Sequence, residues 1–106
     1  VTALNKAELG AEARYEIANC YFQQNNYPAA EKSSFEVINK SGSYDYWVTK
    51  AYILLGDTYW KQKDFFNAKA TFQSIVNNSK IPELKTEAAD KLLRITAEEK
   101  SGSKIQ

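Results

Sequence analysis

The chain has 106 residues, of which 14 are basic and 13 acidic, and its formal net charge is +1. Both signs are scattered, so the sequence has neither the basic stripe of a nucleic-acid-binding protein nor a polybasic membrane patch. No apolar run approaches the roughly 18–20 residues that span a bilayer. Histidine, a glycine-rich phosphate loop and paired-cysteine metal spacing are absent, which argues against an enzyme and against a cofactor or metal.

Apolar residues at helical spacing predict a first helix that starts near Asn5, where Glu8 would complete a capping box. This helix is expected to end at the polar run 23–26. A second helix should follow the cap residue Asn26, with Pro28 in its first turn, and stop before residues 41–43.

Three further helices follow in the same way. The third should begin after Ser43 or Asp45, and Asp64 should cap the fourth, which breaks at residues 77–79. Pro82 opens the fifth helix, which is expected to end in a tail at 101–103. Its apolar stripe consists of Leu84, Ala88, Leu92 and Ile95, and it should cover Ile75 and Val76 of the fourth helix. The acidic pair Glu98 and Glu99 is interpreted as solvated charge. No strand pattern is found.

The chain repeats itself with an offset of 38 residues. Small residues match small ones, aromatic residues match aromatic ones, and the turn residues match as well. Matching pairs include Ala13/Ala51, Ile17/Leu55, Ala18/Gly56, Tyr21/Tyr59, Tyr27/Phe65, Ala30/Ala68, Val37/Ile75 and Asn39/Asn77. A period of this length is typical of stacked helical arrays, in which each unit buries its apolar face against its neighbours.

The second copy resembles a tetratricopeptide repeat. It has Leu55 and Gly56 followed by Tyr59, then Ala68 nine residues later and Phe72 four residues beyond that, in the spacing of the family pattern. The first copy is more degenerate. Where the family pattern has a bulky residue, a glycine and a phenylalanine, the first copy has Arg14, Ala18 and Ser34, with Phe35 next to Ser34.

The resemblance implies an all-α fold, a right-handed α-α superhelix of two tetratricopeptide-like hairpins at about 11–42 and 49–80. Residues 82–100 are expected to form a solvating capping helix. Arg94 stands at the position of Ala18 and Gly56 in the two copies, where a large side chain would keep a following helix from approaching closely. The competing interpretation is a third, incomplete repeat. The period of 38 exceeds the usual 34 or so, which predicts a longer second helix or a longer connection at 41–46. Such stretched repeats resemble those of bacterial cell-envelope proteins, the Tol-Pal-associated coordinator and the outer-membrane assembly lipoprotein, and suggest a piece of a longer multi-repeat scaffold.

In arrays of this family the first helix of each pair lines a concave groove, which binds a peptide or a partner helix. The register implies that Glu12, Tyr15, Asn19, Phe22 and Gln23 line this groove from the first copy, and Lys50, Ile53, Asp57, Trp60 and Lys61 from the second. Phe22 and Trp60 are equivalent by the repeat offset, so two aromatic anchors would share one wall. The alternative is that both rings pack under a neighbouring helix. Trp47 is expected to be structural.

A chaperone C-terminus is not the expected ligand. Chaperone-binding members of the family clamp a terminal carboxylate with Lys and Asn, and Asn19 and Lys50 match two of those positions. Tyr15 and Leu54 depart from the pattern, and Asp57 would repel the carboxylate.

Three classes of function remain. The leading hypothesis is a protein-interaction module, with a protein or peptide and the neighbouring repeats of the parent chain as partners. The second is a structural spacer without a ligand. The third, an RNA-binding helical repeat, is disfavoured because Glu12 and Asp57 balance Lys50 and Lys61.

Overall fold

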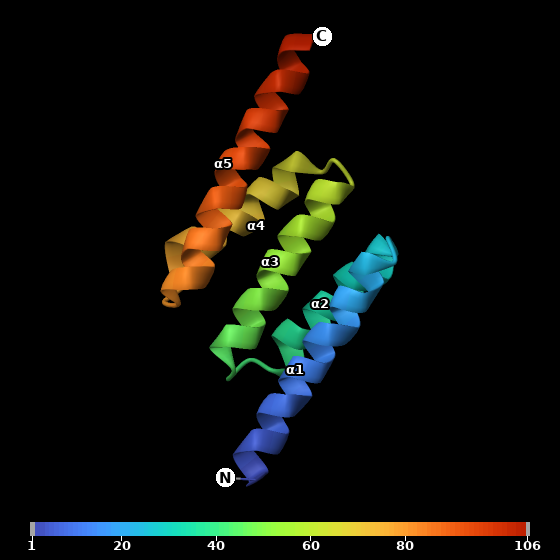
Figure 1. Ribbon diagram of the computed structural model, residues 1–106, viewed down its shortest axis with the longest axis vertical. Helices are drawn as coiled ribbons and strands as arrows, with labels where there is room; N and C mark the ends of the chain where they lie inside the picture. Colours follow the sequence, from blue (N-terminus) through green and yellow to red (C-terminus); the bar gives the residue numbers. More distant parts are fainter. Residues whose placement is uncertain (1, 106) are drawn as a thin grey trace.

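The computed structural model describes the backbone of residues 2–105 and the side chains of residues 7–102, and these residues form five helices (Figure 1). The helices are α1 (Thr2–Gln23), α2 (Tyr27–Lys40), α3 (Asp45–Lys61), α4 (Phe65–Asn78) and α5 (Pro82–Ile105). Residues 2–105 contain no strand, which confirms the predicted all-α class. None of the helices in this part of the chain is long and apolar enough to cross a membrane.

The predicted caps of the second helix in each pair are confirmed. The Asn26 side chain accepts a hydrogen bond from the Ala29 amide at 3.4 Å, and Asp64 accepts one from the Asn67 amide at 3.2 Å. Two predicted ends are wrong. α1 already begins at Thr2, so Asn5 lies within the helix, and α5 continues through the expected tail to Ile105.

The turns from α1 to α2 and from α3 to α4 have the same backbone conformation and the same pattern of backbone hydrogen bonds. Asn25 and Lys63, which are 38 residues apart, have φ values of 62° and 64°. In each turn the amide of this residue donates a hydrogen bond to the carbonyl three residues before it. The amide of the following residue donates to the carbonyl five residues before it, which is that of Tyr21 in the first turn and Tyr59 in the second, both at 2.9 Å. This is the Schellman arrangement, which satisfies the last carbonyls of a helix with one residue in the left-handed conformation.

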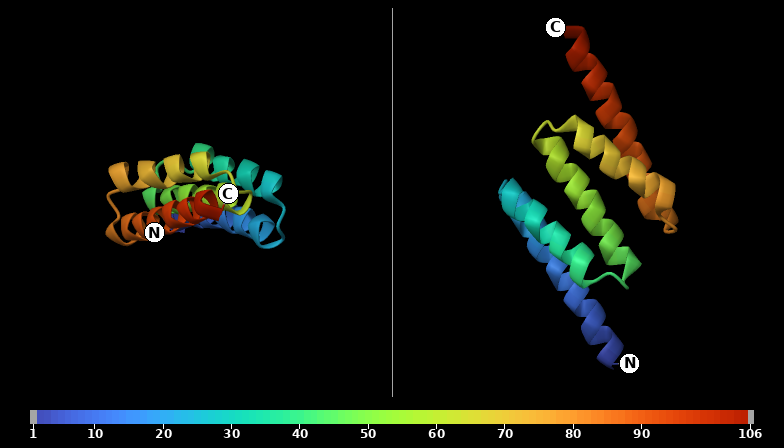
Figure 2. Two further views of the ribbon diagram at one scale, coloured as in Figure 1. Left: turned by 90° about the horizontal axis from the view of Figure 1, so that it is seen from above. Right: turned by 180° about the vertical axis from the view of Figure 1, so that it is seen from behind.

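The helices form two curved layers. Figure 2 (left) shows α1, α3 and α5 on the inner side of the curve and α2 and α4 on the outer side. Each helix contacts its neighbours in the chain, and α3 also contacts α1 and α5. The central helix α3 is therefore covered on both sides, whereas α1 and α5 form the two edges of the stack.

Close packing between paired helices depends on complementary side-chain sizes. A Cβ atom on Gly56 would lie only 2.5 Å from Cε1 of Phe72, which is fully buried. In the first pair the equivalent residues are Ala18 and Ser34, and both are fully buried as well. The extra methyl group of Ala18 is thus accommodated by a smaller partner, and Gly56 lies at a close crossing of α3 and α4.

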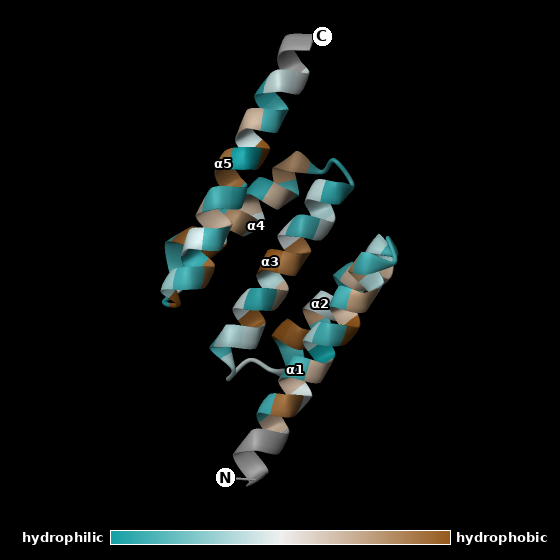
Figure 3. Cartoon of the chain, in the orientation of Figure 1, coloured by the Kyte–Doolittle hydropathy of each residue, from teal (hydrophilic) through white to brown (hydrophobic). Residues whose placement is uncertain are grey.

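The fifth helix buries its predicted stripe. Leu84, Ala88 and Ile95 belong to one core cluster with Ile75 of α4, and Leu92 and Val76 pack against this cluster. Figure 3 shows hydrophobic residues along α3 and on the middle of α5, where it runs beside α4. Because burial of a large aliphatic side chain contributes about 1.5–3 kcal/mol, α5 supplies a substantial part of the stability.

The extra length of the repeat lies in the first helix of the pair, which corrects the prediction. The second helices α2 and α4 each have 14 residues, whereas α3 has 17. The connection from α2 to α3 spans only residues 41–44, α3 begins at Asp45 within the expected range, and Trp47 lies in its first turn.

Candidate functional site

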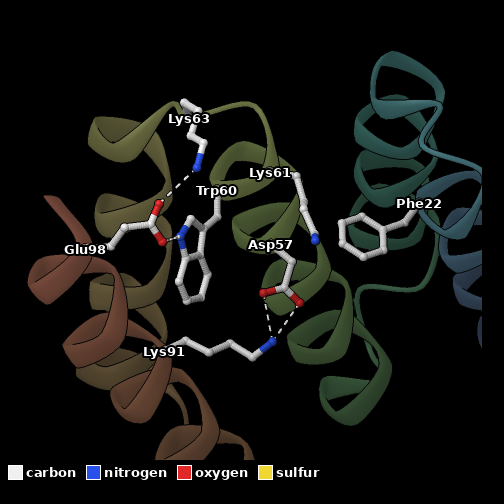
Figure 4. Close-up of a pocket in the computed structure, with 7 residues that line it drawn as sticks. All are labelled: Phe22, Asp57, Trp60, Lys61, Lys63, Lys91 and Glu98. Carbon is white, nitrogen blue, oxygen red and sulfur yellow. Dashed lines mark hydrogen bonds and ion pairs between the residues drawn. The ribbon is translucent and has the colours of Figure 1, made fainter. Parts of the chain in front are cut away.

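A pocket of about 450 Å³ opens on the inner layer, where α1, α3 and α5 lie side by side (Figure 4). Phe22 lines it from α1, and Lys63 lines it from the turn after α3. The remaining lining residues are Asp57, Trp60 and Lys61 of α3 and Lys91 and Glu98 of α5. Four of these seven residues, Phe22, Asp57, Trp60 and Lys61, were predicted from the sequence.

Trp60 links α3 to α4 and to α5. Its ring meets Phe72 edge to face, with 6.2 Å between the ring centroids, and it packs against the core cluster. Its indole Nε1 donates a hydrogen bond to Glu98 at 3.0 Å, and the Lys63 ammonium lies 3.1 Å from the same carboxylate. The hydrogen bond from Trp60, followed by that from Lys63, lowers the pKa of Glu98 below its ordinary value of 4.5. Glu98 is therefore held on the pocket rim as an anion.

The floor of the pocket is an ion pair between neighbouring helices. The Lys91 ammonium donates to both carboxylate oxygens of Asp57, each at 2.8 Å. The two side chains are only 24% and 20% exposed. Burial raises the pKa of Asp57, and this effect exceeds the opposing hydrogen bond and charge of Lys91. Asp57 is thus matched within the protein rather than free for a ligand.

Lys61 and Phe22 are the groups that remain available. Figure 4 shows the Lys61 side chain reaching between Asp57 and the ring of Phe22. Lys61 is exposed, and none of the ion pairs between described residues involves it. The ring of Phe22 is half-buried, 6.0 Å from the ring of Tyr27. The pocket therefore offers an apolar ring beside a cation.

Tyr15 and Lys50 belong to a separate aromatic cluster. The Lys50 ammonium lies 5.2 Å from the Tyr15 ring centroid, and Trp47 lies 5.7 Å from the same ring. Tyr46 completes the cluster, 4.9 Å from Trp47. Burial, with a smaller contribution from Glu16, raises the pKa of Tyr15 to about 12. Neither predicted residue lines the pocket, and the expected structural role of Trp47 agrees with this packing.

The other four predicted residues lie elsewhere, and one of them, Glu12, is half-buried on α1 and outside the pocket lining. Ile53 is 4% exposed and belongs to the core cluster, together with residues of α4 and α5. Its prediction as a groove residue is therefore corrected. Asn19 is half-buried and Gln23 exposed, both on α1 and both outside the pocket lining.

Three of the pocket residues were not predicted from the sequence: Lys63, Lys91 and Glu98. Glu98 and Glu99 are not simply solvated: Glu98 binds Trp60 and Lys63, and Glu99 pairs with Lys69 of α4. One signal was present in the sequence, because Phe22, Trp60 and Glu98 follow each other at the repeat offset of 38. Extending the register once more would have placed Glu98 on the same wall.

Comparison with known families agrees with the geometry of the second helix pair. Residues 49–79, which cover most of α3 and all of α4, match the tetratricopeptide repeat family. Repeats of this family are non-catalytic modules that generally mediate protein–protein interactions. Searches of curated proteins and of solved structures found no match.

Proposed function

We propose that the chain is a protein-interaction module and that the inner-layer pocket binds a peptide or a partner helix. The single observation that carries this proposal is the pairing of an available cation, Lys61, with the half-buried ring of Phe22 in one pocket. Aromatic anchors beside polar groups are typical of binding hot spots. In this proposal Trp60 forms the opposite wall, held in place by Glu98.

The charge balance of the pocket indicates what the partner presents. Lys91 compensates Asp57, and Lys63 compensates Glu98, so Lys61 is the charge left over. The partner is therefore expected to place an apolar side chain against Phe22 and an acidic side chain on Lys61. Asn19 and Gln23, farther along α1, would supply hydrogen bonds to its backbone.

The wider organisation is also a proposal. We assign the repeats to about 11–42 and 49–80 and the capping helix to about 82–100, within a larger scaffold whose neighbouring repeats are further partners. Placement in a bacterial cell envelope rests on the likeness of stretched repeats alone. Fractionation of cells that express the full-length gene product tests it, and recovery in the cytosol would contradict it.

A second candidate function is a structural spacer without a ligand of its own. It is favoured by one observation: both carboxylates of the pocket are already bound within the protein. A spacer would need these contacts only to fix the angle between α3 and α5.

Selection of peptides from a random library on the immobilised protein separates the two candidates. Selected peptides should be rich in apolar and acidic residues. Phe22→Ala should weaken their binding by at least ~30-fold, because a desolvated aromatic anchor is worth about 2 kcal/mol or more. Lys61→Glu should weaken it by roughly 10-fold or more. Phe22 is preferred to Trp60 for this test, since Trp60 also supports Phe72.

Lys32→Glu, the same charge change on the outer helix α2, is the matched control and should leave binding unchanged. Failure to enrich any peptide over an empty support would favour the spacer. Binding that survives both pocket substitutions would place the interaction on another surface.

A further inference from the structure

The edge helix α1 carries an uncovered apolar stripe. All four residues of this stripe are exposed. They share one helical face, because the second, third and fourth lie four, eight and eleven residues after the first. The stripe consists of Leu9, Ala13, Ile17 and Cys20. We call these residues the α1 edge. Glu16 lies within it, and Arg14, the one basic residue between Ala7 and Gln23, is directed to Ser41 instead.

The same positions are covered one repeat later. Ile17 is 53% exposed, whereas its equivalent Leu55 is 3% exposed. Ala51 and Thr58, the equivalents of Ala13 and Cys20, are fully buried. α3 has helices on both sides, since it contacts α1, α2, α4 and α5, whereas α1 contacts only α2 and α3 among the described residues. The α1 edge is thus a kind of surface that this molecule covers with a helix.

The opposite end of the stack has a matching surface, an apolar groove between α4 and α5. Phe66 is 79% exposed and Leu93, the next repeat equivalent of Leu55, is 72% exposed. The groove is lined by Phe66, Lys69, Ala70, Gln73, Leu92, Leu93, Thr96, Ala97 and Lys100. We call these residues the α5 edge. This surface shows that the predicted solvating outer face of the fifth helix is polar only in part.

We propose that the α1 edge of one copy binds the α5 edge of a second copy, so that molecules associate head to tail. Three observations favour a second copy as the occupant. The first is spacing, because the residues of the α1 edge follow one another at four, four and three residues, and Leu93 and Ala97 of the α5 edge are also four residues apart.

The second is shape. The α1 stripe alternates large, small and large at Leu9, Ala13 and Ile17. On the α5 edge the large Leu93 is followed one turn later by the small Ala97, and the half-buried Ala89 lies one turn before Leu93. Side chains of such stripes interdigitate when helices pack.

The third observation is charge. The α1 edge carries Glu16, whereas the lining of the α5 edge contains Lys69 and Lys100 and, within the described part of the chain, no acidic residue. Lys69 is paired with Glu99, so Lys100 is the main cation offered to a partner. Because the two surfaces differ, the contact is heterologous and does not close on itself after two copies.

Analytical ultracentrifugation over a concentration series tests the proposal. The mass of the wild-type chain should rise from that of a monomer through that of a dimer to higher species. Ile17→Lys and Leu93→Lys each block one edge, at positions exposed enough to leave folding intact, as circular dichroism would verify. Each variant alone should remain a monomer, and an equimolar mixture should form dimers and stop there, because one intact edge of each kind remains. Phe35→Lys, which removes an exposed aromatic side chain from α2, should associate like the wild type.

A wild-type chain that stays monomeric over the whole series would overturn the proposal and leave both edges to helices of another sequence. A mixture of the two variants that stays monomeric, although the wild type associates, would also overturn it. The peptide-binding test does not depend on either edge, so the two proposals can fail separately.

Discussion

At the scale of single residues, Lys63 occupies a backbone conformation that suits asparagine or glycine better. The left-handed conformation costs a residue with a Cβ roughly 1–2 kcal/mol, and Asn tolerates it best after Gly. The ion pair with Glu98 that would be lost is largely exposed and screened by solvent, so its loss should matter little. Lys63→Asn is therefore expected to stabilise the protein by about 0.5–1 kcal/mol in urea unfolding.

The reverse substitution at the equivalent turn, Asn25→Lys, is the matched control for Lys63→Asn. It should destabilise by a similar amount. Equal stability of Asn25→Lys and the wild type would show that the turn conformation carries no strain.

Gly56 is expected to tolerate no added methyl group. Its Cβ would clash with the buried ring of Phe72, so Gly56→Ala should cost about 1–3 kcal/mol through overpacking. Gly10→Ala is the control: its Cβ would have only an ordinary contact with Arg14, at 3.8 Å. Within the helix it should stabilise by about 0.5–1 kcal/mol. Thermal unfolding of both variants measures this difference, and a higher melting temperature for Gly56→Ala would contradict the crossing described above.

The hydrogen bond between Trp60 and Glu98 makes the pocket rim sensitive to acid. The pKa of Glu98 is lowered in the folded protein. The ionised Glu98 carboxylate therefore contributes to folding stability above its ordinary pKa, and this contribution is lost as the pH falls through the lowered pKa. We expect the ¹⁵N-correlated indole signal of Trp60 to titrate below pH 4.5. The signal should not titrate there in Glu98→Gln. A titration that persists in this variant would assign it to another group.

At the scale of elements, we expect α5 to be required for folding although it lies at the edge of the stack. Leu84, Ala88 and Ile95 are buried against α4, and large aliphatic side chains contribute about 1.5–3 kcal/mol each, of a total that is typically ~5–15 kcal/mol. Truncation after Lys80 should therefore unfold or aggregate the protein, as measured by circular dichroism and light scattering. Truncation after Lys100 removes none of these residues and should leave the melting temperature within a few degrees. A shortened chain that stays folded and monomeric without α5 would disprove this role.

At the scale of the whole molecule, the features that could be predicted from the sequence are those determined by neighbouring residues or by the repeat. The caps at Asn26 and Asp64 and the start at Pro82 follow from side-chain chemistry within one turn. The close crossing at Gly56 follows from its match with Ala18. These features need no knowledge of how distant helices are rotated.

The parts of the site that were missed depend on the rotation of one helix against another. Ile53 lies only four positions from Asp57, yet Ile53 is buried in the core cluster, whereas Asp57 lines the pocket and binds Lys91. Lys91 and Glu98 enter the pocket because α5 lies beside α3 in the inner layer. Periodicity within α5 predicts its buried stripe, but it does not reveal which flank faces the pocket.

The central claim is that the pocket lined by Phe22 and Trp60 is the binding surface of the molecule, and the indole signal of Trp60 reports on it directly. The chain has two tryptophans and therefore two indole signals in an ¹⁵N-correlated spectrum, which Trp47→Phe assigns. Addition of a peptide selected on the protein should shift the Trp60 indole signal and leave that of Trp47 in place. A bound peptide that moves the Trp47 signal or the amides of α2 and α4, while the Trp60 signal stays unchanged, would contradict the account.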